Sequence, residues 1–205
     1  MELTATQQDA LTELINIGYA RAAAALSDLT GHRISLEVPE VAIHVISEIK
    51  TRLLPVIKDE VASVNQVFSG PINGNAILLL DREAALLLNS LLTDRDQAQG
   101  KLDGAAREVI TEVGNILLNA CLGAFGNLLK VQVTFTVPYL QVDNVDKVLR
   151  SITVEGSELE YALIIHTRFH MRASNVSGYL VIILGVTSLK TLLEELRKWE
   201  ERELR

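Results

Sequence analysis

The stretch "REVITEVGNILLNA", from Arg107 to Ala120, places Glu112, Asn115 and Asn119 three and four residues apart among apolar positions of helical period. Residues at these spacings are neighbours on one helix surface. The stretch therefore predicts an amphipathic helix. Its apolar face goes to the core, and Glu112 and Asn115 form a small polar patch that faces outward.

An earlier stretch, "QDALTELINIGYA" from Gln8 to Ala20, has the same rhythm. Four positions match at one constant offset of 99 residues: Asp9, Glu13, Asn16 and Pro39 with Glu108, Glu112, Asn115 and Pro138. Later positions match at a slightly different offset, Gly74 with Gly178 and Leu80 with Leu184. An internal duplication accounts for this pattern better than chance does.

Both halves show the same predicted order of elements. In the first half we predict a helix from Ala5 to about Leu29 with Gly31 beyond its end, a strand ending at Pro39, a hairpin across 60–81 and a helix over 82–93. The segment 41–54 is ambiguous, and a short helix is one interpretation of it. A polar, glycine-bearing joint follows at 93–104.

In the second half we predict a helix from Gly104 to about Phe125 with Gly126 beyond it, a strand ending at Pro138 and a short helix over 143–152. A second hairpin across 159–185 and a charged amphipathic helix from Ser188 complete it.

These elements predict an α/β fold, an α+β sandwich that forms a single domain over residues 1–205. It is built of two repeats, about 1–98 and 99–205, of a helix–strand–helix–hairpin–helix unit with pseudo-twofold symmetry. We expect about six mostly antiparallel strands packed with helices. With 48% hydrophobic residues, a chain of 205 residues can bury one sizeable core.

Composition excludes several classes of function. The formal net charge is −7, and no basic stripe for a nucleic acid is present. Cys121, the single cysteine, lies in an Ala/Leu/Gly run that indicates an inert buried thiol. The polar N-terminus does not resemble a signal peptide, and the longest apolar runs are too short to span a bilayer. We expect a soluble cytoplasmic protein without membrane insertion.

The chemistry open to a Glu/Asn patch is limited. A carboxylate can pair with a Lys or Arg of a partner, and a carboxamide can hold a water in a chosen direction. The patch contains no activated nucleophile, metal cage or cofactor cradle, so any catalysis needs the other half of the active site from the substrate. A single Glu-x2-Asn pair is common on surface helices, and duplication copies inert residues too.

The doubled motif resembles the CheC/CheX/FliY family of chemotaxis phosphatases, and in length and duplication its CheC type. In each half Glu-x2-Asn is followed, after 22 residues, by a proline: Glu13, Asn16 and Pro39, then Glu112, Asn115 and Pro138. The family pattern has Asp or Ser four residues before the Glu. Asp9 fits this pattern, whereas Glu108 departs from it but stays acidic.

The resemblance implies a protein aspartyl-phosphate phosphatase, a hydrolase acting on the response regulator CheY in its phosphorylated form. Glu13 and Glu112 would each pair with the regulator's active-site Lys. Asn16 and Asn115 would each align the attacking water. No cofactor of its own is implied, because phosphorylated CheY supplies Mg²⁺.

The resemblance also implies the receptor deamidase CheD as a second partner, and a monomer, since the duplicated chain resembles a fused dimer. The alternative is a non-catalytic CheY-binding adaptor or flagellar-switch-like scaffold, as FliM is. FliM lacks the Glu-x2-Asn pairs that this chain has twice, which favours the enzyme. CheD regulation as the main role stays open.

Four other residues of the sequence are weaker candidates for a functional role. His166 and His170 lack the Cys or carboxylate pattern of a zinc site. Trp199 is expected to cover the edge of the core, with a docking anchor as the alternative. Asn119 is interpreted as an exposed spacer, with a role in shaping the second patch as the alternative.

Overall fold

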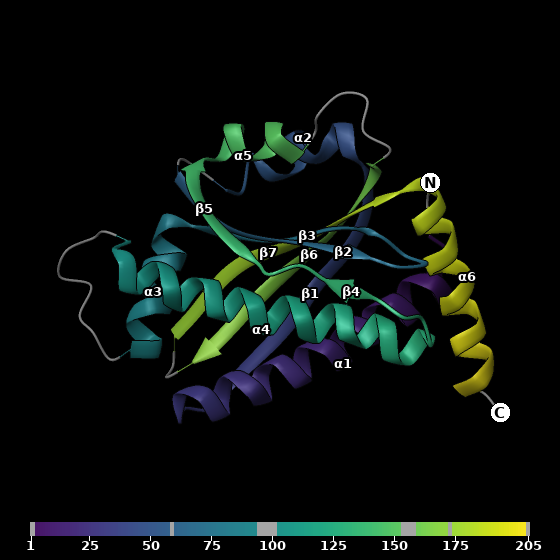
Figure 1. The fold of residues 1–205 in the computed structure, drawn as a ribbon, viewed down its shortest axis with the longest axis horizontal. Helices are drawn as coiled ribbons and strands as arrows, with labels where there is room; N and C mark the ends of the chain where they lie inside the picture. Colours follow the sequence, from purple (N-terminus) through teal and green to yellow (C-terminus); the bar gives the residue numbers. More distant parts are fainter. Residues whose placement is uncertain (1–2, 58–59, 94–101, 153–158, 172–173, 204–205) are drawn as a thin grey trace.

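The computed structural model describes residues 3–57, 60–93, 102–152, 159–171 and 174–203, and it consists of one seven-stranded sheet between two layers of helices (Figure 1). The long helices α1 (Ala5–Thr30) and α4 (Gly104–Leu129) cover one face, together with α3 (Arg82–Thr93) and α6 (Val186–Glu203). The short α2 (Ile49–Leu53) and α5 (Val145–Ile152), with the 3-10 turn η1 (Ile46–Glu48), cover the other face. The predicted α/β sandwich is confirmed.

The sheet is antiparallel and has the order β1-β6-β7-β3-β2-β4, with β5 also paired to β2. Its strands are β1 (Ile34–Val45), β2 (Glu60–Ser69), β3 (Gly74–Asp81), β4 (Thr134–Phe135), β5 (Tyr139–Asn144), β6 (Leu159–Met171) and β7 (Ser174–Gly185). Both predicted hairpins, β2–β3 and β6–β7, are confirmed. The strand that precedes each hairpin in the chain pairs with the other hairpin, β1 with β6 and β5 with β2, so the two halves are interleaved.

The two long helices have matching ends. Each has 26 residues, and the N-caps Thr4 and Asp103 each accept a backbone hydrogen bond from the first turn. After α1, Gly31 takes a left-handed conformation with φ 68°, as expected from its position. After α4, Lys130 takes the same conformation with φ 58°. The prediction that α4 stops before Gly126 was wrong, because the helix continues one more turn before that cap.

The two prolines of the motif lie at the edges of the sheet, but they do not end strands as predicted. β1 continues through Pro39 to Val45, with a register shift between Glu37 and Glu40. An edge strand with a bulge tolerates a proline because no ladder hydrogen bond is lost there. The strand expected before Pro138 is reduced to the two residues of β4, and β5 begins after the proline. The sheet therefore has seven strands instead of about six.

The main core lies between the sheet and the two long helices, which contact each other closely. A Cβ atom added to Gly18 of α1 would lie 2.9 Å from the Cα of Cys121 in α4. A Cβ added to Gly114 would lie 2.5 Å from the Cγ1 of Val64 in β2. Helix α4 therefore packs closely against α1 at Gly18 and against β2 at Gly114.

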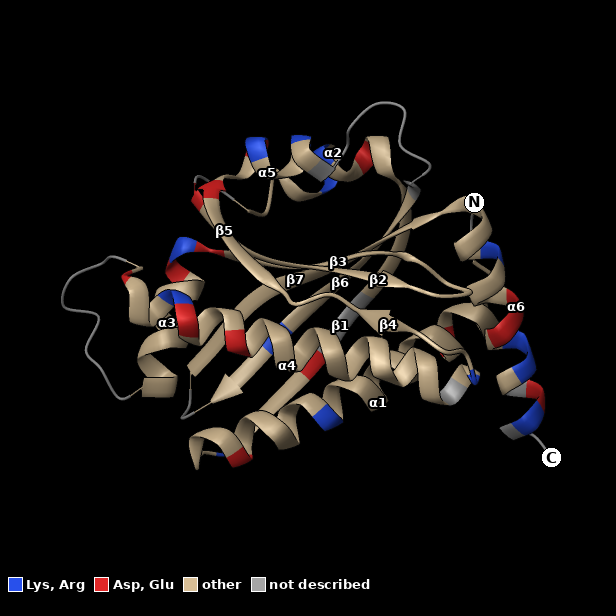
Figure 2. Ribbon diagram, viewed as in Figure 1, with Lys and Arg blue, Asp and Glu red and all other residues tan. Residues whose placement is uncertain are grey.

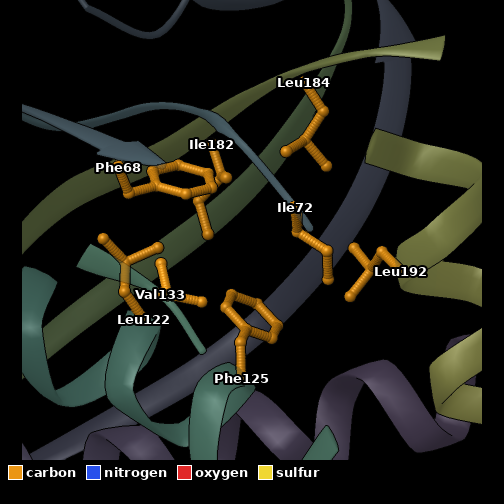
Figure 3. A pocket seen from close by; sticks show the side chains of 8 residues that line it. All are labelled: Phe68, Ile72, Leu122, Phe125, Val133, Ile182, Leu184 and Leu192. Atoms are coloured by element: carbon orange, nitrogen blue, oxygen red, sulfur yellow. The ribbon is translucent and has the colours of Figure 1, made fainter. Parts of the chain in front are cut away.

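Towards the end of α4 the core encloses a small apolar cavity of about 10 Å³. Figure 3 shows Phe125 of α4 and Leu192 of α6 on one side of it and Phe68 of β2 on the other. The lining is completed by Ile72, Leu122, Val133, Ile182 and Leu184. This cluster attaches the C-terminal half of α4 to the β2–β3 hairpin and to α6.

Helix α4 is apolar and long enough over Gly104–Asn127 to cross a membrane by length and composition alone. Half of its most apolar stretch is buried inside the fold, as in the core helix of a globular protein. Its acidic residues, Asp103 at the cap, Glu108 and Glu112, all lie towards its N-terminal end, whereas α6 carries charges of both signs (Figure 2).

Candidate functional site

The first candidate patch, here called the α1 patch, consists of Asp9, Glu13 and Asn16. All three side chains are exposed. The opposite face of α1 is fully buried, with Leu11, Leu14 and Ile15 among its residues. Within the part of the chain that the structure describes, no hydrogen bond of the Glu13 or Asn16 side chain is formed. These two groups are oriented only by the helix that carries them.

The second candidate, the α4 patch, consists of Glu108, Glu112 and Asn115. The two carboxylates are exposed, and Asn115 is half-buried. Its Nδ2 lies 3.5 Å from Oε2 of Glu112, at the long limit of a hydrogen bond. The outward placement predicted for both patches is therefore confirmed, but the environments of the two asparagines differ.

Beneath the α4 patch a chain of hydrogen bonds leads into the core. Asn119 donates from Nδ2 to Oδ1 of Asn115 at 2.6 Å. Gln66 of β2 donates from Nε2 to Oδ1 of Asn119 at 3.0 Å and to the backbone oxygen of Thr136 at 2.9 Å. The interpretation of Asn119 as an exposed spacer was wrong, since it is half-buried and connects Asn115 to the sheet.

Gln66 was not singled out from the sequence. The four-residue spacing of Asn119 from Asn115 is a local signal that could have identified Asn119. Gln66 lies 53 residues before Asn119 in the chain, and no local pattern links the two. The two residues meet only because β2 packs beneath α4 in the tertiary structure.

Each long helix is also tied to the segment that carries its proline. The side chain of Gln8, in the first turns of α1, donates to the backbone oxygen of Val41, two residues after Pro39. Gln66 connects α4 to Thr136, two residues before Pro138. In each half, the long interval between the Asn and the proline of the motif therefore leads from a helix to an edge of the sheet. The hydrogen bonds that connect the two ends of this interval differ in chemistry between the halves.

The α4 patch borders a groove of about 340 Å³ between the C-terminal half of α1 and the N-terminal half of α4, which run antiparallel (Figure 1). Glu108 and Glu112 lie on its wall, opposite Leu26 and Leu29 of α1. The remaining lining residues are Thr30, Leu92, Thr93, Val109 and Val113. Carboxylates beside an apolar groove suit a partner surface with a cation next to apolar side chains.

The other residues considered from the sequence lie elsewhere. Cys121 is buried at the contact of α1 and α4, and burial raises the pKa of its thiol well above the ordinary value. His166 stacks on Tyr179 with ring centroids 5.0 Å apart, and Nε2 of His170 lies 3.0 Å from a Glu37 carboxylate oxygen. Among the described residues, no three His, Cys, Asp or Glu side chains gather as a metal site would require. Trp199 is half-buried and packs against the main core.

The chain is similar to known proteins in sequence and in fold. No protein-family model matches the chain. Over 165 residues, 78% of each chain, it is 27% identical to the CheY-P phosphatase CheC of Bacillus subtilis (strain 168). The chain is thus similar in sequence to a member of the CheC/CheX/FliY family.

Solved structures show the same fold. FliY of Thermotoga maritima superposes with a TM-score of 0.79 at 19% identity, covering 97% of this chain and 100% of that one. FliM in the FliM–SpeE complex from H. pylori superposes with a TM-score of 0.68 at 13% identity, covering 97% and 98%. The α4 and α1 patches thus lie on the two long helices of a fold that this chain shares with FliY and FliM.

Proposed function

We propose that this protein is a phosphatase that hydrolyses the aspartyl phosphate of the response regulator CheY. The observation that carries the proposal is the pair of outward-facing Glu-x2-Asn patches on the long helices of a CheC/CheX/FliY fold. The named activity of the related Bacillus subtilis CheC supports the same substrate.

The residues of the patches suit this reaction. Glu13 and Glu112 would each accept an ion pair from a Lys of the regulator, and Asn16 and Asn115 would each hold a water in line with the phosphoryl group. The water oxygen forms a bond to phosphorus while the bond to the Asp carboxylate breaks, and the water proton passes to the released phosphate. Such a reaction depends mainly on positioning and charge stabilisation. The Mg²⁺ that it needs would come with the phosphorylated regulator, so no cofactor of this chain is required.

Several further expectations belong to the same proposal. The chain acts as a cytoplasmic monomer, because two repeats in one chain supply two patches without a partner copy. It also binds the receptor deamidase CheD on a surface outside the two patches. Size-exclusion chromatography with light scattering, with and without CheD, tests the monomer and the complex.

The direct test measures the decay of radiolabelled phospho-CheY with the wild type, Asn16→Ala, Asn115→Ala and the double variant. We expect the wild type to accelerate decay and the double variant to lose all of the acceleration. Binding to CheY carrying a stable phosphoryl analogue is measured in parallel, and the double variant should still bind. Equal decay with all four proteins would refute the phosphatase.

A non-catalytic CheY-binding adaptor is the second candidate. The likeness to FliM, at a TM-score of 0.68, favours it. An adaptor would bind phospho-CheY without shortening the life of the phosphate, and the same experiment distinguishes the two candidates. The duplicated patches favour the phosphatase, because a docking surface does not need a carboxamide three residues from each carboxylate.

A further inference from the structure

We propose that Asn119 and Gln66 are positioning residues that hold the Asn115 carboxamide with Oδ1 turned inward and Nδ2 turned outward. The catalytic part of this inference rests on the proposed phosphatase function. The part that concerns orientation rests only on the hydrogen bonds beneath the α4 patch. These three side chains are called the relay.

The backbone of Thr136 sets the direction of every hydrogen bond in the relay. A carbonyl oxygen can only accept, so Gln66 must point Nε2 towards Thr136, where the distance is 2.9 Å. The same Nε2 lies 3.0 Å from Asn119, which must therefore present Oδ1 to it. Asn119 then has only Nδ2 available for Asn115, so Asn115 must accept this hydrogen bond with Oδ1, at 2.6 Å.

Gln66 is an unusual residue for its place. Its side chain is 2% exposed, and its Oε1 has no hydrogen-bond partner within the described structure. A buried acceptor without a partner is unfavourable, and an apolar side chain of similar size would avoid this. The opposite orientation of the amide would be worse, because two oxygens would then face each other at Thr136. The fold thus retains a partly unsatisfied amide that supports Asn119.

The α1 patch lacks such a relay. The residue four positions after Asn16 is Ala20, which has no polar side chain. The nearby polar pair, Tyr19 with Thr167 of β6, is fully buried and forms a closed contact inside the core. Asn16 can therefore rotate about its side-chain bonds, whereas Asn115 is held.

This orientation determines what the substrate meets. Asn115 turns Nδ2 outward: one N–H faces Oε2 of Glu112 at an Nδ2 distance of 3.5 Å, and the other can donate to the oxygen of a water or of a phosphoryl group. Its Oδ1 keeps one free lone pair. A side chain held beforehand loses less freedom when the transition state forms, so the benefit falls on kcat rather than on KM. Loss of one such hydrogen bond corresponds to a change of about fivefold in rate.

The kinetic test uses the full chain with Asn16→Ala, which leaves only the α4 patch able to act on phospho-CheY. In this background Asn119→Ala should lower kcat about fivefold with KM unchanged within about twofold. Gln66→Met keeps the buried volume and removes both donors, and it should lower kcat in the same direction. Asn127→Ala, an exposed asparagine of the same helix, is the matched control, and thermal unfolding of each variant separates positioning from folding.

A second measurement tests the orientation without using activity. The Asn115 side-chain Nδ2 resonance, assigned by its loss in Asn115→Ala, should show an ordered amide by ¹⁵N relaxation, and the Asn16 amide a mobile one. Asn119→Ala should make the Asn115 amide as mobile as that of Asn16, and an unchanged order parameter would overturn the inference. An unchanged kcat in Asn119→Ala, or no activity with Asn16→Ala when the wild type is active, would overturn its catalytic part. If the wild type itself shows no activity, the proposed function fails and relaxation alone decides the orientation.

Discussion

The α1 and α4 helices show how two helices of the same length and motif become differently supported sites. Both have 26 residues, both end in a left-handed residue, and both carry Glu-x2-Asn at the same distance from the helix start. One of the positions at which they differ lies one turn after the Asn, where α1 has Ala20 and α4 has Asn119. Because of that difference Asn115 is connected to the sheet, whereas Asn16 is oriented by its helix alone.

The comparison shows that the motif and the support of the motif are separate features. The motif decides which residues face a partner, and helical spacing is sufficient for this. The support depends on a side chain from β2 and on a backbone oxygen before β5, both remote in sequence. The four predictions below test whether this support, and not a difference in the helices themselves, makes the two patches unequal.

The largest expected effect concerns the contact between the helices. Cys121 is buried against Gly18, and burial raises the pKa of its thiol, so the thiol stays protonated at neutral pH. We expect iodoacetamide at pH 8 to react with it on the order of 10³-fold more slowly than in guanidinium-unfolded protein. A rate close to that of the unfolded chain would mean that the helix pair opens readily, and helix mobility would then explain the difference between the patches.

The second prediction compares two glycines of α4. A Cβ at Gly114 would overlap the side chain of Val64, whereas a Cβ at Gly123 meets no atom within 4 Å. Gly114→Ala should lower the free energy of unfolding by about 1–3 kcal/mol. It should also lengthen the hydrogen bonds of the relay, because Val64 and Gln66 lie on the same strand and would move together away from α4.

The matched variant of this pair is Gly123→Ala. It should raise the free energy of unfolding by about 0.5–1 kcal/mol, since alanine favours a helix over glycine. Urea unfolding of both variants measures the difference. Destabilisation by both substitutions would contradict the close packing of α4 against β2 at Gly114.

The third prediction compares the two asparagines directly. If the relay makes the α4 patch about five times faster, Asn115→Ala should leave about one sixth of the phosphatase rate. Asn16→Ala should leave about five sixths of it. The decay of phospho-CheY at saturating enzyme measures both rates. Equal losses would show that orientation by the relay does not matter to the reaction.

The smallest effect is expected from Ala20→Asn, which gives α1 the residue that α4 has. The hydroxyl of Thr167 in β6 is already bonded to the neighbouring Tyr19, so it is not available as a partner for the new carboxamide. We expect less than a twofold change in the rate of the α1 patch, measured in the Asn115→Ala background. A fivefold gain would show that the asparagine one turn on is sufficient and that Gln66 is not needed.

Much of this fold could be predicted from local patterns. The apolar period placed Leu14 and Val113 in the core and turned Glu13 and Glu112 outward, because each residue of a helix has a fixed direction. Alternation predicted both hairpins, whose pairing partners are close in sequence. The prolines were misread as strand ends because a bulge at a sheet edge has no clear signal in the local sequence.

The sequence by itself determined the long helices, the hairpins, the residues of the two patches and the resemblance to a family. Only the tertiary structure decided the exchange of strands between the halves and the different support of Asn16 and Asn115. The physical reason is the range of the interactions. Helical spacing acts over three or four residues, whereas the hydrogen bond from Gln66 to Asn119 forms only when β2 is placed beneath α4.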